Sequence, residues 1–193
     1  VVELTTIEQV QKYASEIDII QVGTRNMYNY ELLKEVGKTK NPVILKRAFS
    51  ASYEEWLGAA EYILKEGNKS VILCERGIKN YLSTETRNIL DIQAIPYIQN
   101  NTPFRIIVDP SHASGHRYMV PSMSKASLSA GCDGLLLEVH KNPEESLCDS
   151  KQTIDLNTLD EIYKNNPPKK GEARFDDPVF KRFHDELSKK FEE

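Results

Sequence analysis

The sequence predicts an α/β fold in which the strands of a parallel sheet alternate with helices. Six short apolar runs recur between residues 1 and 139, and segments with apolar residues at helical spacing separate them. The runs are continuous rather than alternating, as is typical of strands that are buried on both faces of a parallel sheet. Charged residues follow nearly every run directly. Together these observations indicate a sheet whose carboxyl ends carry ionisable groups.

The first two strands lie close to the start of the chain. Residues 1–4 predict the end of one strand, and Thr5 with Glu8 predicts a capping box that opens the first helix. A second apolar run at residues 17–22 stops at Gly23, which predicts the second strand.

Two further strands follow, each preceded by a predicted helix. A helix predicted at residues 30–36 precedes a strand at residues 42–45, which is entered through a proline, as the start of an element permits. Ser52 and Glu55 predict a second capping box at the start of the next helix. That helix leads to the fourth strand, at residues 70–74.

The last two strands complete the alternation. A helix is predicted at residues 86–99, where isoleucines recur on one face, and it leads to the fifth strand at residues 104–108. A helix at residues 120–130 then delivers the chain to the sixth strand, at residues 134–139.

The alternation of strands and helices is less regular towards the C-terminus. A helix is predicted at residues 156–163, a linker rich in proline and lysine at residues 165–171, and a last helix beyond it, on which His184 is interpreted as a surface residue. We therefore predict two parts, a catalytic partial (β/α) barrel over residues 1–152 and a C-terminal helical extension over residues 153–193.

Parallel strands that helices return form either a TIM-type (β/α)8 barrel or an open, doubly wound sheet. The sequence contains neither a GxGxxG fingerprint nor a P-loop, either of which would mark a nucleotide site in a doubly wound sheet. We therefore favour the barrel. Because about six βα units are present, the predicted barrel is incomplete.

Composition narrows the classes of function. Of the 193 residues, 39% are hydrophobic and 28% charged, as in ordinary globular proteins, and the net charge of -4 offers no basic field for nucleic acid. No apolar run is long enough to span a membrane, and no signal peptide is recognisable. The cysteines Cys74, Cys132 and Cys148 form no CxxC pair, which predicts reduced thiols in a cytoplasmic enzyme.

Ionisable residues follow five of the six predicted strands. They are Arg25, Lys46, Arg47, Glu75, Arg76, Asp109, His112, Glu138 and His140. Such charges can simply mark where a buried strand meets solvent, but five successive cases with both signs favour a shared site. A barrel collects the carboxyl ends of all its strands in one mouth, where barrel enzymes carry out their chemistry.

The signs of these charges divide the predicted mouth into two groups. Arg25, Lys46, Arg47 and Arg76 form a cationic group for which phosphate or carboxylate is the natural counter-charge. A second group, His112, Glu138 and Asp149, offers one nitrogen and two carboxylate ligands, which suits a divalent transition metal.

Five motifs, in this order and spacing, resemble those of the type Iβ 3-deoxy-7-phosphoheptulonate (DAHP) synthases. They are Gly23-Thr24-Arg25-Asn26, Leu45-Lys46-Arg47, Leu73-Cys74-Glu75-Arg76-Gly77, Asp109-Pro110-Ser111-His112-Ala113-Ser114-Gly115 and Leu137-Glu138-Val139-His140-Lys141-Asn142-Pro143. The resemblance implies a (β/α)8 barrel that condenses phosphoenolpyruvate with erythrose 4-phosphate, in the first step of the shikimate pathway to the aromatic amino acids.

The resemblance also implies roles for individual residues. His112, Glu138 and Asp149 would hold a divalent metal (Mn, Fe, Co or Zn), and Arg25, Lys46, Arg47 and Arg76 would bind phosphoenolpyruvate. Lys46 is further expected to donate a proton, and Glu75 or Asp109 to manage the water that adds to the substrate. Cys74 belongs to the family's Cys-Glu-Arg-Gly segment and is interpreted as a buried structural thiol.

Two motifs of the resembling family are not found in this sequence. They are a Pro-Cys motif that supplies a fourth metal ligand and a Lys-Pro-Arg motif for the sugar phosphate, both of which belong to two strands that precede the region matched here. We therefore expect a fragment of a longer enzyme, without synthase activity on its own. A chain completed by another polypeptide and a degenerate relative are the two alternatives.

Other functions remain open at the level of sequence. One is the related 3-deoxy-octulosonate 8-phosphate synthase reaction, which uses arabinose 5-phosphate, and another is a non-catalytic module that binds a phosphorylated ligand. Because an incomplete barrel has open edges, we also expect association into a homo-oligomer.

Overall fold

The computed structural model describes residues 1–79, 81 and 85–165. Six segments of this part of the chain pair into one sheet. The strands are β1 (Val2–Glu3), β2 (Ile20–Val22), β3 (Val43–Lys46), β4 (Val71–Glu75), β5 (Arg105–Val108) and β6 (Gly134–Leu135). Each strand pairs in parallel with the next one along the chain. This sequential order is that of a barrel wall, since the order reverses in a doubly wound sheet.

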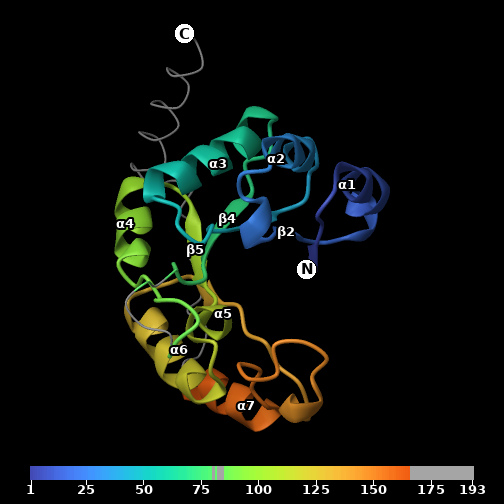
Figure 1. Ribbon diagram of the computed structural model, residues 1–193. Coiled ribbons are helices and arrows are strands. Elements are labelled where there is room, and N and C mark those ends of the chain that lie inside the picture. Colours follow the sequence, from blue (N-terminus) through green and yellow to red (C-terminus); the bar gives the residue numbers. More distant parts are fainter. Residues whose placement is uncertain (80, 82–84, 166–193) are drawn as a thin grey trace.

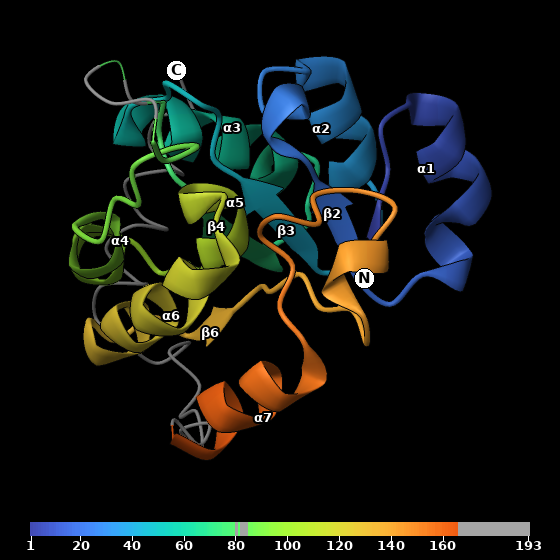
Figure 2. The ribbon, with the colours of Figure 1, turned by 60° about the horizontal axis from the view of Figure 1, so that its bottom comes forward.

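Helices follow the strands along the chain, and most of them lie on the outer side of the sheet (Figure 1). They are α1 (Ile7–Tyr13), α2 (Tyr30–Gly37), α3 (Tyr53–Lys65), α4 (Ala94–Asn101), α5 (Pro110–Ser114), α6 (Val120–Ser129) and α7 (Leu156–Asn165). In Figure 1, α2, α3, α4 and α6 follow an arc, and Figure 2 shows α1 and α7 at its two ends. The fold is thus an α/β half-barrel, and the predicted incomplete TIM-type barrel is confirmed.

The main core lies between the sheet and this outer layer of helices. Trp56 on α3 is fully buried and donates a hydrogen bond from Nε1 to the carbonyl of Leu45 on β3 at 3.2 Å. Gly37 lets α2 approach α3 closely, since a Cβ there would lie 2.7 Å from the carbonyl oxygen of Ile63. The two central strands are therefore covered by helices that pack directly against each other.

A smaller apolar cluster fixes the end of the described chain. The cluster buries Val120 of α6, Ile162 of α7 and Ile154, which precedes α7. Ile154 also forms a parallel bridge with Val139, beyond β6. The predicted linker, the last helix and His184 lie outside the described residues, and the division into two parts stays a prediction. No helix in the described part of the chain has the length and apolarity that crossing a bilayer requires.

The capping box at Ser52 is confirmed, whereas the one predicted at Thr5 is wrong. Ser52 accepts a hydrogen bond from the backbone of Glu55, and the Glu55 carboxylate accepts one from the Ser52 backbone. In α1 the cap is Thr6, which accepts from the backbone of Gln9, while the backbone and hydroxyl of Thr5 donate to the Gln9 side chain. The start of α1 is therefore capped by Thr6 and Gln9, and not by the predicted pair Thr5 and Glu8.

The helix predicted at residues 86–99 is wrong in its first half. Helix α4 begins only at Ala94. The residues before it form bends, an isolated bridge and a turn. The backbone of Arg87 donates to the carbonyl of Ser114, and Ile89 forms an antiparallel bridge with Ile78. Hydrogen bonds to distant segments therefore outweigh the helical spacing of the isoleucines.

Two predicted strands are at least three residues longer than the observed ones. Strand β2 begins at Ile20, because the 3₁₀ turn at Ala14–Glu16 is followed by a bend at residues 18–19. Strand β6 ends at Leu135, and the chain then leaves the sheet towards the site while the backbone of Leu136 still donates to Val108.

Candidate functional site

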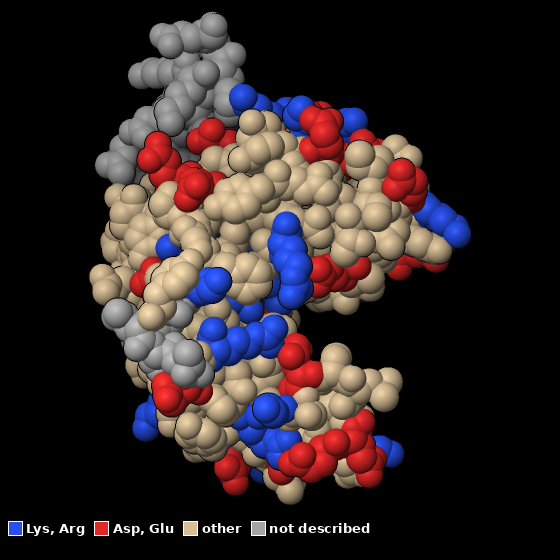
Figure 3. Space-filling model, viewed as in Figure 1, with Lys and Arg blue, Asp and Glu red and all other residues tan. Residues whose placement is uncertain are grey.

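The carboxyl ends of β3, β4 and β5 lie at one edge of the sheet. Lys46 pairs in register with Cys74, and Glu75 with Val108. The backbone of Asp109 donates to the carbonyl of Glu75 at 2.8 Å, which continues the ladder one step past β5. The strand-end charges predicted to share a site are therefore brought together. In Figure 3, Lys and Arg side chains gather at the back of the hollow on this side of the molecule.

Asp109 is the centre of the hydrogen bonding at this edge. It caps α5, accepting at Oδ1 from the backbone of His112 at 2.9 Å, and its Oδ2 lies 2.8 Å from Lys46 Nζ and 2.7 Å from His112 Nδ1. The side chain of Asp109 is fully buried. Burial alone would raise its pKa, but the hydrogen bonds from His112 and the charge of Lys46 outweigh burial and hold the pKa below its ordinary value.

The three predicted metal ligands converge. His112 Nε2 lies 3.4 Å from Glu138 Oε1 and 3.6 Å from Asp149 Oδ2, and one ligand atom from each residue falls within 4.8 Å of the others. Because Asp109 engages Nδ1, Nε2 is the ring nitrogen that faces the two carboxylates. Burial raises the pKa of Glu138, and the neighbouring His112 offsets part of that effect.

Sequence reasoning missed two residues that hold these carboxylates. Arg87 Nη1 donates to Asp149 at 3.0 Å and to Gln152 Oε1 at 2.9 Å, while Gln152 Nε2 donates to Glu138 at 2.6 Å. Arg87 lies in the segment that was wrongly predicted as a helix. Its Cβ also leaves no room for a side chain at Gly115, where an added Cβ would lie 2.6 Å away and the φ of 72° already favours glycine. Arg87 and Gln152 thus link the two carboxylates to each other.

Arg76 is the buried cation of the site with spare hydrogen-bonding capacity. It is 2% exposed, and its Nε is buried without a hydrogen-bond partner among the described residues. Its guanidinium lies over the ring of Phe49, 4.8 Å from the ring centroid, and the exposed Arg25 lies over the same ring at 5.9 Å. Burial lowers the pKa of Arg76. A buried guanidinium with an open donor is suited to an incoming anion.

Arg47 has a different environment, although it follows β3 as Arg76 follows β4. Its Nη1 pairs with Glu75 at 2.9 Å and with Asp91 at 2.8 Å, its Nε donates to a carbonyl, and its guanidinium lies over the ring of Tyr53. These groups supply protein partners for the charge of Arg47. Contact of Arg47 with substrate and a catalytic role for Glu75 stay predictions.

Cys74 is buried, as predicted for a structural thiol. Burial raises the pKa of the thiol well above its ordinary value.

The family model described as the DAHP synthetase I family matches residues 1–169. The chain is 43% identical over 157 residues to phospho-2-dehydro-3-deoxyheptonate aldolase of Thermotoga maritima, an alignment that covers 81% of this chain and 46% of that protein. It is also 30% identical to 2-dehydro-3-deoxyphosphooctonate aldolase of Geobacter sulfurreducens, covering 84% of this chain and 62% of the relative. The chain thus spans about half to six-tenths of the length of these two relatives.

Solved structures agree with the sequence relatives. The crystal structure of DAHP synthase from Thermotoga maritima superposes with a TM-score of 0.82 at 42% identity, covering 84% of this chain and 48% of that one. A truncated form of the synthase from the same organism gives the same score and identity, covering 85% and 62%. The resemblance inferred from the motifs is confirmed: the chain belongs to the DAHP synthetase I family.

Proposed function

We propose that this chain carries the metal- and phosphoenolpyruvate-binding part of a DAHP synthase. The reaction is the condensation of phosphoenolpyruvate with erythrose 4-phosphate, which opens the shikimate pathway. The observation that carries the proposal is the convergence of His112, Glu138 and Asp149 at the same sheet edge as the buried guanidinium of Arg76. One half of this arrangement suits a divalent metal and the other suits a phosphorylated acid.

The donor set fits a divalent Mn, Fe, Co or Zn ion. It combines one imidazole nitrogen with two carboxylates, and Asp109 orients the imidazole through Nδ1. A metal held by His112, Glu138 and Asp149 would supply Lewis acidity towards the aldehyde oxygen of the sugar phosphate. Gln152 and Arg87 keep the two carboxylates in place.

The cations at the edge position the second substrate. Arg76 and Arg25, which share the ring of Phe49, bind the phosphate and carboxylate of phosphoenolpyruvate and neutralise their charge, so that a second anionic substrate can approach. Lys46 holds a proton at Nζ, 2.8 Å from the buried Asp109 carboxylate, and is placed to donate it.

Binding experiments test the proposal without requiring turnover. Calorimetric titration of the protein with Mn²⁺ and with phosphoenolpyruvate should show both ligands bound. His112→Ala should abolish Mn²⁺ binding, and Arg76→Met should weaken phosphoenolpyruvate while leaving Mn²⁺ binding unchanged. Lys34→Met, which removes an exposed cation paired with Glu31 on α2, serves as the control. Binding of neither ligand by the wild type would instead indicate a relative that has lost the site.

The second candidate reaction uses arabinose 5-phosphate in place of erythrose 4-phosphate. The relative at 30% identity carries the name of that activity, whereas the relative at 43% identity carries that of the heptonate aldolase. Phosphate release by a complete synthase that contains this chain, measured with each aldose, separates the two reactions. Erythrose 4-phosphate should be preferred, and release by this chain alone at the rate of a complete synthase would contradict the expected inactivity of the isolated chain.

A further inference from the structure

Asp149 is carried by a loop without regular structure, between the 3₁₀ turn at Pro143–Glu145 and α7. Its φ of 47° makes it the single non-glycine residue with positive φ in the described part of the chain. A left-handed backbone is uncommon for a residue with a Cβ and persists where the surroundings hold it. The placement of this carboxylate therefore depends on what anchors the loop.

Part of the anchoring is local. The carbonyl of Asp149 accepts hydrogen bonds from the backbone of Gln152 at 3.0 Å, from the backbone of Thr153 at 3.2 Å and from the Thr153 hydroxyl at 3.0 Å. These bonds define the turn around Asp149. They do not determine where the turn lies relative to His112, which belongs to a different segment.

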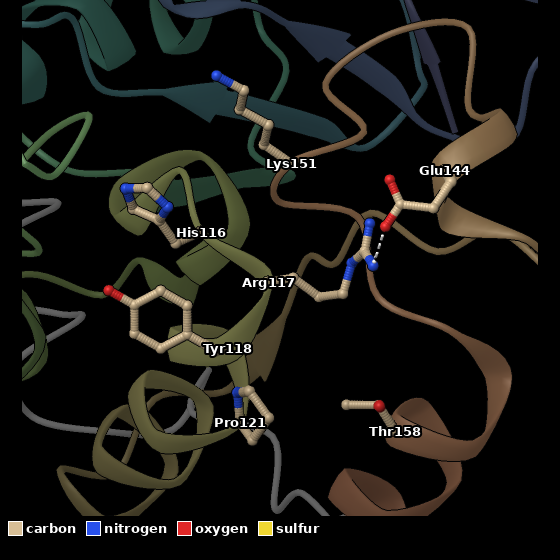
Figure 4. A pocket seen from close by; sticks show the side chains of 7 residues that line it. All are labelled: His116, Arg117, Tyr118, Pro121, Glu144, Lys151 and Thr158. Atoms are coloured by element: carbon tan, nitrogen blue, oxygen red, sulfur yellow. Dashed lines mark hydrogen bonds and ion pairs between the residues drawn. The ribbon is translucent and has the colours of Figure 1, made fainter.

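Arg87 binds the Asp149 carboxylate directly, and Arg117 supplies a second link, which acts on the backbone of the loop. Arg117 begins the 3₁₀ turn Arg117–Met119, which follows the helix that carries His112 by two residues. Its four hydrogen bonds to the loop run from N to Lys151 O at 2.8 Å, from Nε to Thr153 O at 2.6 Å, from Nη2 to Ser150 O at 2.8 Å and from Nη1 to Glu144 Oε1 at 2.7 Å. Figure 4 shows the side chain reaching across to Glu144 beside an open cavity of about 510 Å³.

The four hydrogen bonds of Arg117 differ in how strongly they can hold the loop. The Glu144 side chain is 83% exposed, so its ion pair is screened by solvent. The side chain of Arg117 is 33% exposed, and its bonds to the carbonyls of Ser150 and Thr153 are part-buried. These bonds use the fixed fork of the guanidinium, which an ammonium group cannot reproduce. The carbonyl contacts are thus the ones that locate the loop.

We propose that Arg117 is a positioning residue for the metal site, which holds Asp149 opposite His112 by binding the carbonyls that follow Asp149. The inference rests on the proposed metal site and adds a residue that touches none of the ligands with its side chain. Removal of a partner that hydrogen-bonds a ligating side chain typically weakens metal binding by about 10- to 100-fold, and Arg117, which acts through the backbone of the loop, is expected at the lower end of that range.

The test is a Mn²⁺ titration of the full chain and its variants by calorimetry and by electron paramagnetic resonance. Arg117→Gln should weaken Mn²⁺ binding about 10-fold. Arg117→Lys should recover only part of this loss, because it keeps the charge but not the fork. Glu144→Gln, which removes the exposed contact alone, should change the affinity about threefold or less.

Lys151→Gln is the matched control for charge. Lys151 lies on the same loop, and its backbone carbonyl rather than its side chain accepts from Arg117. Loss of a positive charge close to a cation site should by itself leave Mn²⁺ affinity unchanged or raise it. Weaker binding in Arg117→Gln together with unchanged or tighter binding in Lys151→Gln therefore identifies geometry, not charge, as the cause.

Hydrogen exchange of the metal-free proteins separates positioning from a general role in folding. Faster exchange in Arg117→Gln should be confined to residues 144–153. Faster exchange across the whole sheet, or Mn²⁺ affinity equal to that of the wild type, would overturn the proposal while leaving the metal site intact. Absence of Mn²⁺ binding in the wild type would overturn both.

Discussion

Two groups of buried charge lie at the carboxyl edge of the sheet, and they differ in whether their hydrogen bonds close within the protein. The Arg47 cluster consists of Arg47, Glu75, Asp91 and Tyr53. Its guanidinium pairs with both carboxylates, and the Tyr53 hydroxyl donates to Asp91 at 2.8 Å. Burial would lower the pKa of Arg47, but these two acids raise it above its ordinary value.

The Asp109 cluster, which consists of Lys46, Asp109 and His112, is open instead. Asp109 binds both of its basic partners, yet His112 keeps Nε2 directed at Glu138 and Asp149. The side chain of His112 is 21% exposed, whereas that of Arg47 is 6% exposed. The comparison teaches that charges at the ends of neighbouring strands can pair fully with one another in one case and leave a donor atom directed at further carboxylates in the next.

The largest expected effect comes from breaking the closed cluster. Arg47→Met leaves the fully buried Glu75 without its cation, which should lower the free energy of unfolding by about 3–5 kcal/mol. Urea denaturation measures the loss. Lys34→Met, which breaks an exposed pair on α2, should leave the free energy of unfolding nearly unchanged. Equal losses in the two variants would show that the Arg47 cluster does not act as a buried network.

The second effect should fall on the open cluster alone. Asp109→Asn replaces the carboxylate that orients His112, so Mn²⁺ affinity should fall by about 10- to 100-fold, or about 1.4–2.7 kcal/mol. Asp91→Asn makes the same chemical change in the Arg47 cluster and should reduce stability without changing Mn²⁺ affinity. Mn²⁺ titration of the two variants measures this difference. An equal loss of Mn²⁺ affinity in both would show that the two clusters do not differ in their role at the metal site.

The sequence was sufficient for the architecture because the signals are local and repeated. Continuous apolar runs, such as the one that ends at Leu45, predicted parallel strands, and Ser52 with Glu55 predicted a helix start that the structure confirms. The prediction of a helix at residues 86–99 was wrong in its first half because the contacts there are not local. Ile89 fits a helical face by spacing, but it is 45% exposed and bridges to Ile78, a contact that no local pattern encodes.

The candidate site was predictable in part. The strand-end position brought His112 and Glu138 together as expected, since parallel strands deliver their ends to one edge. The partners of the two strand-end arginines were not predictable, because Asp91, which pairs with Arg47, comes from an irregular segment. Arg117 was missed for the same reason, since its carbonyl partners carry no sequence signal.

The smallest effect concerns the alkaline limit of the Arg47 cluster. Burial and the hydrogen bond to Asp91 raise the pKa of Tyr53 from 10.0 to about 12. Between these values the unfolded chain loses the phenolic proton while the folded protein keeps it, so this group's contribution to stability is lost as the pH rises through that window.

Tyr53→Phe should therefore lose less stability than the wild type between pH 10 and about 12, as measured by urea denaturation across that range. Tyr163→Phe, which removes an exposed phenol, is the control for losing a tyrosine in general. The difference in tyrosinate absorbance between wild type and Tyr53→Phe should also titrate near the upper value. A titration near 10.0 would mean that Tyr53 does not donate to Asp91 and that the Arg47 cluster is open at this point, which would remove its contrast with the Asp109 cluster.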